Sequence, residues 1–191
     1  MFDWLVLRCM LNCINFSYLK RSNVTNLILM RHAKSDWSEN LADFERVLNT
    51  RGRKCCLALR AWFAEINIKP DIALVSSAKR TQLTFELIFG IPKITPESIQ
   101  YDDMLYQGDS TQIIKAIRTT ASTNNTILVI GHNPSISQVA HFLCMSGQKE
   151  NLPIFPTGAF AMLSFPNSEF EYHSGELIHF IAARTLMDDN E

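Results

Sequence analysis

The chain has 191 residues, with 18 Lys and Arg, 19 Asp and Glu and a formal net charge of −1 at pH 7. A chain of this length, with 47% hydrophobic and 19% charged residues, is expected to form one globular domain. The balanced charge argues against a protein that binds nucleic acid through its overall charge, and no apolar run reaches the roughly 20 residues that a membrane helix needs.

Residues 1–25 do not share the pattern of the rest of the chain. The segment is apolar but interrupted by polar residues, and it lacks the basic start and cleavage site of a signal peptide. We predict that it forms an N-terminal extension and that residues 26–186 form the domain. Two interpretations stay open for the extension: a start assigned too far upstream, or an amphipathic helix packed on the domain.

From residue 26 onward, predicted strands and helices alternate. The predicted strands are short apolar runs, typical of strands buried on both faces: residues 27–30, 72–75, 98–101, 126–130, 159–165 and 176–183. The predicted helices comprise residues 51–67, with Thr50 as N-cap, 78–89, 110–121, and a helix from Pro134 to about residue 145. Residues 90–97 and 147–158 are predicted loops. This alternation predicts a single-domain α/β fold, a three-layer α/β/α sandwich around a mainly parallel sheet.

The five cysteines predict neither a disulfide framework nor a zinc site, because their number is odd and no two are spaced C-x-x-C. Cys55 and Cys56 are adjacent within a helical pattern, which indicates buried free thiols. Free thiols are typical of a reducing compartment, so we expect a cytoplasmic protein.

Side chains suited to binding phosphate follow four of the predicted strands. In open α/β sheets, sites lie beyond the carboxyl ends of the strands. Two arginines, two histidines and an acidic pair are therefore expected at one edge of the sheet: Arg31, Arg80, His32, His132, Asp102 and Asp103. Guanidinium groups bind phosphate oxygens, a neutral imidazole can attack phosphorus, and a second imidazole can stabilise the transition state.

Other hydrolytic chemistries do not fit the spacing of the residues. A cysteine phosphatase needs an arginine six residues after its cysteine, where this chain has Ala61, Trp62 or Glu150. The motifs D-x-D, G-x-x-x-x-G-K-[ST], G-x-S-x-G and H-E-x-x-H do not occur. A metal on His32, His132 and Asp102 is chemically conceivable, but two neighbouring arginines would repel a cation, so we expect neither a metal nor a cofactor.

Five motifs in order along the chain resemble the histidine phosphatase superfamily, which has the phosphoglycerate mutase-like fold. Residues 31–37, RHAKSDW, are similar to the SixA-like phosphohistidine phosphatase branch. Residues 43–53, DFERVLNTRGR, resemble the family's D-x-x-R-P-L-N-x-R-G-R stretch, with Val47 where proline is usual. The other three matching segments are SSAKRTQLT at 76–84, VIGHNP at 129–134 and PTG at 156–158. The resemblance covers residues 26 to about 184.

The resemblance implies a role for each matching residue. His32 would be the nucleophile, Arg31 and Arg80 would bind the phosphoryl oxygens, and His132 would stabilise their charge. Substrate-binding positions are implied for Lys34, Ser35, Ser38 and Asn133, with Ser38 standing where the mutase branch commonly has asparagine. Asp102 or Asp103 matches the stretch that supplies a glutamate general acid in mutase-type members, while a solvated acidic loop is an equally open interpretation.

The predicted function is that of a metal-independent phosphatase with a phosphohistidine intermediate, acting on phosphohistidine in a signalling protein. The loops after the strands are short, so we expect a site open to a protein side chain. Two alternatives stay open: a small-molecule phosphomonoesterase, and a phosphate-binding module without catalysis. We expect a monomer that binds a phosphorylated protein or small phosphorylated substrate, and neither nucleic acid nor a membrane.

Overall fold

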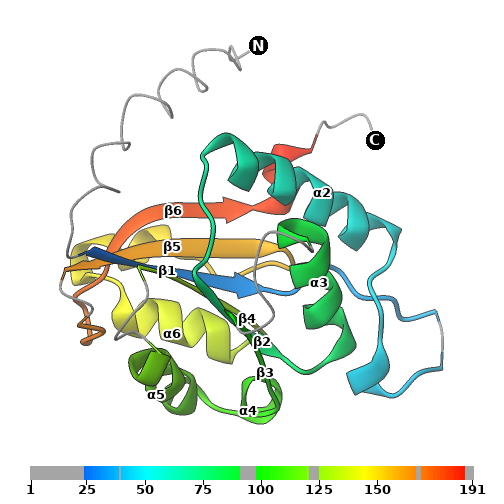
Figure 1. Ribbon diagram of the computed structural model, residues 1–191, viewed down its shortest axis with the longest axis horizontal. Coiled ribbons are helices and arrows are strands. Elements are labelled where there is room, and N and C mark those ends of the chain that lie inside the picture. The colour runs from blue at the N-terminus through cyan, green and yellow to red at the C-terminus, as the bar shows by residue number, and fades with distance from the viewer. Residues whose placement is uncertain (1–23, 39, 91–97, 121–124, 167–168, 188–191) are drawn as a thin grey trace.

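The computed structural model describes residues 24–38, 40–90, 98–120, 125–166 and 169–187 (Figure 1). Residues 1–23 of the predicted extension lie outside the described residues, as do residues 91–97 of a predicted loop. Val24 and Thr25, which we assigned to the extension, form the beginning of the first strand.

Six strands form one sheet, and their order is β3-β2-β4-β1-β5-β6. Their bounds are β1 Val24–Arg31, β2 Ile72–Ser76, β3 Ile99–Asp102, β4 Thr126–Gly131, β5 Ala159–Pro166 and β6 Glu176–Ala182. Only β5 runs antiparallel to its two neighbours, whereas the pairs β1–β4, β2–β4 and β2–β3 are parallel. The predicted mainly parallel sheet is confirmed.

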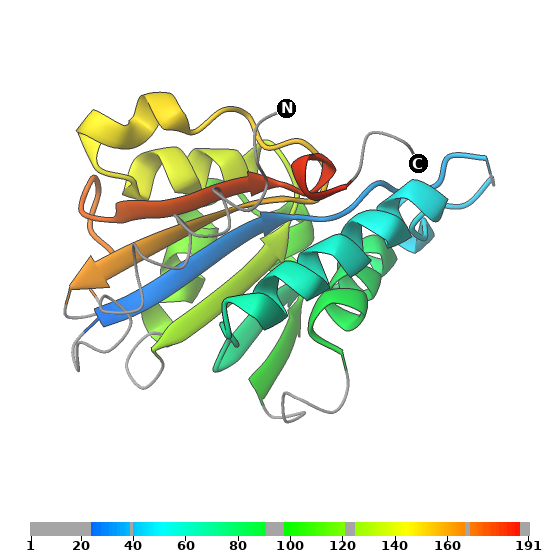
Figure 2. The same cartoon turned by 90° about the horizontal axis from the view of Figure 1, so that it is seen from above.

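Helices cover both faces of the sheet, which confirms the predicted three layers (Figure 2). Helices α2 (Thr50–Glu65) and α3 (Lys79–Phe89) lie on one face, and α5 (Ser110–Thr120) and α6 (Ser135–Leu143) lie on the other. The short elements are α4 Met104–Gln107 and the 3-10 turns η1 Asp43–Glu45, η4 Ser146–Asn151 and η5 Ala183–Leu186. Within the described residues, no helix is long and apolar enough to cross a membrane.

The central strand β1 separates two hydrophobic clusters. Leu27 and Leu29 belong to the cluster beneath α5 and α6, whereas Ile28 and Met30 belong to the cluster beneath α2 and α3. This alternation follows from the two-residue period of a strand. All four side chains are fully buried, and each contributes about 1.5–3 kcal/mol to the free energy of unfolding. The burial of these four side chains therefore fixes the position of the carboxyl end of β1, at Arg31.

Two predictions about local structure were wrong, and one short helix was not predicted. The N-cap of α2 is Asn49, whose side chain accepts a hydrogen bond from Gly52 N at 2.8 Å, and Thr50 is the first residue of the helix. The predicted loop 147–158 contains most of η4. Helix α4 was not predicted, because four residues are too few to show helical periodicity.

Gly52 is required where α2 passes the chain segment after β1. A Cβ atom at residue 52 would lie 2.2 Å from the carbonyl oxygen of Lys34. We expect Gly52→Ala to lower the free energy of unfolding by about 2–4 kcal/mol, because backbone would have to move to relieve the overlap. Gly147→Ala is the matched control, since a Cβ there meets nothing within 4 Å. Denaturant unfolding of both variants checks this, and equal stabilities would contradict it.

Candidate active site

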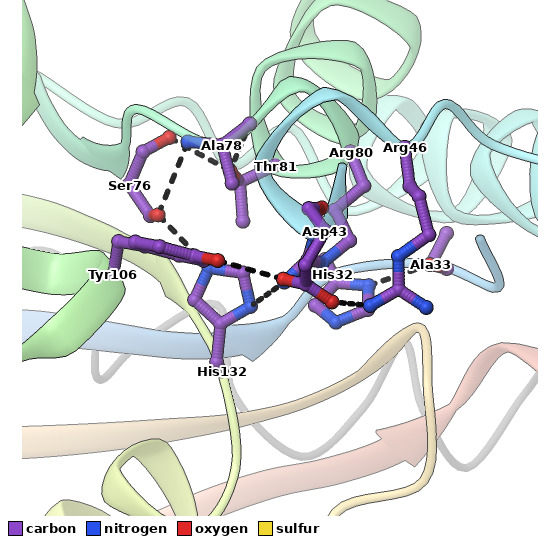
Figure 3. Close-up of polar contacts among 10 residues, drawn as sticks. All are labelled: His32, Ala33, Asp43, Arg46, Ser76, Ala78, Arg80, Thr81, Tyr106 and His132. Atoms are coloured by element: carbon purple, nitrogen blue, oxygen red, sulfur yellow. Dashed lines mark hydrogen bonds and ion pairs between the residues drawn. The ribbon is translucent and has the colours of Figure 1, made fainter. Parts of the chain in front are cut away.

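A cavity of about 600 Å³ opens at the carboxyl ends of β1 and β4, beside the first turn of α3 (Figure 3). Arg31 is the last residue of β1, Arg80 is the second residue of α3, and His132 directly follows β4. The cavity is lined by seven of the ten predicted site residues: Arg31, His32, Lys34, Ser35, Arg80, His132 and Asn133. The sheet topology thus brings together side chains about a hundred residues apart in the chain.

The imidazole of His32 is buried and held in one tautomer. Its Nδ1 lies 2.7 Å from the carbonyl oxygen of Ala33, which can only accept, so Nδ1 carries the hydrogen and Nε2 has a free lone pair. Burial, with the charges of Arg80, Arg31 and Arg46, lowers the pKa of His32 to about 3. His32 is therefore neutral near pH 7, as a nucleophilic imidazole must be.

The second imidazole, His132, lies next to the first, with ring centroids 5.0 Å apart. Its Nδ1 accepts a 3.3 Å hydrogen bond from Nη2 of Arg80, since a guanidinium only donates. Its Nε2 is then protonated and donates to Oγ of Ser76 at 2.9 Å. Burial, followed by the nearby His32 and the charges of Arg80 and Arg31, lowers the pKa of His132 to about 3. Both rings are neutral in this structure.

Arg80 is bound by Asp43, a residue to which the sequence analysis gave no role. Nη2 of Arg80 lies 2.9 Å from Oδ2 of Asp43, and Nη1 donates to the backbone oxygen of the same residue. The Asp43 carboxylate also pairs with Nη2 of Arg46 and accepts a 2.8 Å hydrogen bond from the hydroxyl of Tyr106 (Figure 3). The aspartate therefore fixes the guanidinium groups of two arginines at the cavity wall.

The residues missed by sequence reasoning differ in the signal they offered. Asp43 and Arg46 are the first and last residues of the quoted D-x-x-R motif. Asp43 begins the 3-10 turn η1 and Arg46 is its C-cap. This motif could have identified both residues. Tyr106 stands on α4, whose four residues carry no recognisable pattern. Its position at the cavity follows only from the tertiary fold.

Arg31 and Asn133 are joined through one carbonyl group. Nη1 of Arg31 donates to the oxygen of Phe155 at 2.8 Å, and Nδ2 of Asn133 donates to the same oxygen at 2.9 Å. The Asn133 side chain also accepts from the hydroxyl of Ser137 at 2.8 Å. Nε of Arg31 is buried with no hydrogen-bond partner among the described residues, so this guanidinium has capacity left for an anion.

Three predicted site residues lie away from the cavity lining: Ser38, Asp102 and Asp103. The hydroxyl and the amide of Ser38 both donate to Oδ1 of Asp36, at 2.7 and 2.8 Å. Asp102 accepts a 2.8 Å hydrogen bond from the amide of Met104, in a turn that starts α4, and Asp103 is exposed. Local turns thus engage Ser38 and Asp102, and the acidic side chain at the cavity is Asp43 instead.

The segment that carries His32 is held from three sides. The amide of His32 donates to Gly131 of β4 at 3.2 Å, and the carbonyl of His32 accepts from Gly158 at 3.0 Å. The amide of Ala33 donates to Oγ1 of Thr84 at 3.1 Å, and that hydroxyl donates to the carbonyl of Arg80 at 2.7 Å. The segment at His32 and the first turn of α3 at Arg80 are thereby linked to one another through Thr84.

The two neutral histidines make the protein sensitive to acid. An unfolded histidine has a pKa of about 6.5, above the folded value of about 3 for His32, so between these values the unfolded chain binds more protons. Stability is fully present above pH 6.5 and is lost as pH falls, by up to about 1.4 kcal/mol per pH unit for each histidine. Urea unfolding between pH 7.5 and 5 is expected to show this fall. The slope should be shallower in His32→Asn, and parallel curves would contradict the assignment.

No group of three His, Cys, Asp or Glu side chains that could hold a metal ion occurs in the part of the chain that the structure describes. The cavity instead presents three guanidinium groups, those of Arg31, Arg46 and Arg80. Such a lining suits an anion with several oxygen atoms.

Comparisons with known proteins agree with this chemistry. Residues 27–105 match the family model of the histidine phosphatase superfamily (branch 1). The chain is 30% identical over 166 residues to the uncharacterized protein ML1117 of Mycobacterium leprae (strain TN). The aligned region covers 81% of this chain and 100% of that protein.

Solved structures have the same fold. A proposed phosphohistidine phosphatase SixA from Nakamurella multipartitia superposes with a TM-score of 0.74 at 26% identity, over 84% of this chain and 96% of that one. The protein histidine phosphatase SixA complexed with tungstate superposes with a TM-score of 0.72 at 22% identity, over 85% of this chain and 100% of that one.

Proposed function

Because this chain belongs to the histidine phosphatase superfamily, we propose that it removes the phosphoryl group from phosphohistidine in a protein, without a metal, through a phosphohistidine intermediate on His32. Membership of the superfamily supports phosphatase activity. The nucleophile, the intermediate and the substrate are the parts that we propose.

One observation carries the proposal: the lone pair of His32 Nε2 is free in a cavity lined by three guanidinium groups. The hydrogen bond from Nδ1 to Ala33 leaves Nε2 unprotonated, and burial among the arginines keeps the ring neutral. The same cations attract a phosphoryl group and neutralise the charge on its oxygens. A neutral nucleophile beside a cationic oxyanion site is the arrangement that phosphoryl transfer to histidine needs.

The reaction has two displacements at phosphorus. In the first, Nε2 of His32 forms a bond to phosphorus while the bond from phosphorus to the leaving nitrogen breaks, and that nitrogen is released with a proton from solvent. In the second, water attacks the phosphorus, the bond to Nε2 breaks, the water proton passes to solvent, and inorganic phosphate leaves. Arg31 and Arg80 bind the phosphoryl oxygens, and His132 donates a hydrogen bond to them after it takes up a proton in the presence of the dianion.

The acid–base groups at the cavity favour a nitrogen leaving group. Among the described residues lining the cavity, Asp43 is the carboxylic side chain, and its pairing with Arg46 and Arg80 stabilises the anion. An ionised carboxylate is a poor proton donor. The imidazole of a phosphohistidine has a basic nitrogen that solvent can protonate, whereas an alkoxide leaving group needs a stronger acid.

The test is phosphate release from a phosphohistidine-bearing protein, measured in the presence of a chelator. We expect the wild type to release phosphate at an unchanged rate when the chelator is added. Loss of activity with the chelator would overturn the metal-free mechanism. Release from a small phosphomonoester but not from the phosphohistidine protein would establish the small-molecule alternative, and retention of the phosphoprotein without release would establish a binding module.

A further inference from the structure

Trp37 is an indole at the mouth of the cavity, and its surface is largely free. The side chain is 74% exposed, yet it lines the same cavity as His32 and Arg80. An exposed aromatic ring beside a ligand cavity offers a flat apolar surface that a ligand can cover. The indole therefore stands where a substrate would pass or rest.

One face of this indole is already occupied. The central carbon of the Arg46 guanidinium lies 3.6 Å from the ring centroid, a cation–π contact. Arg46 is buried, and its Nε and Nη1 have no hydrogen-bond partner among the described residues. Because Arg46 covers one face, the exposure of Trp37 belongs to the opposite face and the edges of the ring.

The position of the indole is linked to the phosphate-binding residues. Arg46 pairs through Nη2 with Asp43, and the Asp43 carboxylate binds Nη2 of Arg80 at 2.9 Å. Trp37 thus rests on a chain of contacts that ends at the arginine expected to hold the phosphoryl group. The free face of the ring is a preorganised surface at a set position relative to the reacting phosphorus.

In-line attack places the leaving group on the side of phosphorus opposite His32. His32 is 7% exposed, so the leaving group points away from the cavity floor, toward the mouth. Of the two aromatic side chains described at the cavity, Tyr106 packs edge-on against His132 and donates its hydroxyl to Asp43. Trp37 is the one with an open face.

We propose that the free face of Trp37 stacks on the imidazole ring of the substrate phosphohistidine, and that this contact selects an aromatic ring on the leaving side of phosphorus. The inference rests on the proposed function, because it assigns the leaving group of that reaction. Trp37 is a specificity-determining residue here, since it touches the part of the substrate that distinguishes phosphohistidine from other phosphoramidates.

The experiment compares free phosphohistidine with phosphoramidate, which has the same phosphorus–nitrogen bond but no ring. Trp37→Ala is expected to lower kcat/KM for phosphohistidine about tenfold more than for phosphoramidate, mainly through KM, because a stacked aromatic pair is worth about that factor. Trp37→Phe should recover most of the difference. Tyr172→Ala is the matched control, since Tyr172 is an exposed aromatic residue that packs on Phe142 and does not line the cavity.

Equal losses on the two substrates would overturn the proposal, because they would mean that Trp37 only supports Arg46. A loss confined to a phosphohistidine protein, and absent with free phosphohistidine, would also overturn it and assign Trp37 to the polypeptide. In both cases, turnover of phosphohistidine by the wild type leaves the proposed function intact. No turnover of phosphohistidine by the wild type would overturn both proposals.

Discussion

Replacement of His32 by asparagine is expected to lower phosphate release at least about a thousandfold, because no other group of the cavity can take the phosphoryl group from the same position. Asparagine keeps a polar side chain of similar size but cannot form a stable phosphorus–nitrogen bond. A wild-type enzyme mixed with substrate and quenched at alkaline pH should carry one phosphoryl group by intact-mass measurement, and the variant should carry none.

The matched control for this variant is His173→Asn. His173 is exposed, it does not line the cavity, and its backbone has φ of 63°, a conformation that asparagine tolerates well. The control is expected to retain wild-type turnover and phosphoenzyme. Activity of His32→Asn within tenfold of the wild-type activity would contradict the assignment of His32 as nucleophile.

Arg80→Lys is expected to lower kcat/KM about a hundredfold, although the charge is kept. The guanidinium of Arg80 reaches the Asp43 carboxylate and His132 at the same time, at 2.9 and 3.3 Å. A lysine ammonium is a single point of charge and cannot present two parallel donors to a phosphoryl group. It would also leave Asp43 and Nδ1 of His132 without the donor that positions them.

Two measurements check this prediction. The first is steady-state turnover, and the second is the affinity for inorganic phosphate, which reports binding without chemistry and should fall together with kcat/KM. Arg184→Lys is the control, because Arg184 is exposed and does not line the cavity. Turnover of Arg80→Lys within threefold of wild type would show that the fork geometry of the guanidinium is not needed.

The strands and long helices could be predicted from the sequence because the spacing of their apolar residues reflects which side chains are buried. Continuous apolar runs such as residues 27–30 match strands that are covered on both faces. Strands β2, β4 and β5 begin and end within two residues of the expected bounds. Strand β1 also ends within two residues of the expected position, but it begins earlier, at Val24. The N-cap of α2 was assigned to the wrong residue because Asn49 and Thr50 are both able to cap. Sequence alone does not decide which of two adjacent polar residues accepts the first free amide.

The arrangement at the cavity was predictable only in part. Residues that directly follow strand ends, such as His32 and His132, are placed there by the topology of a parallel sheet, and this follows from the pattern. The ion pair of Asp43 with Arg80 joins residues 37 positions apart in the chain, and no local sequence pattern predicts this contact. Asp102 failed as a cavity residue because the nearest donor to its carboxylate is the amide two residues ahead, in its own turn.

The hydrogen bonds that hold the segment at His32 fix the position of that side chain. They do not fix the residues that follow it, among which Trp37 lies at the opening of the cavity. His32 and Ala33 are fastened to Gly131, Gly158 and Thr84, all of which belong to the sheet and its adjoining helices and turns. The described residues 36–38 and 40–42, which include Trp37, lie in the chain between these hydrogen-bonded residues and Asp43. These described positions are therefore a target for directed evolution of the substrate range, except that a change at Trp37 also removes its contact with Arg46, which pairs with Asp43.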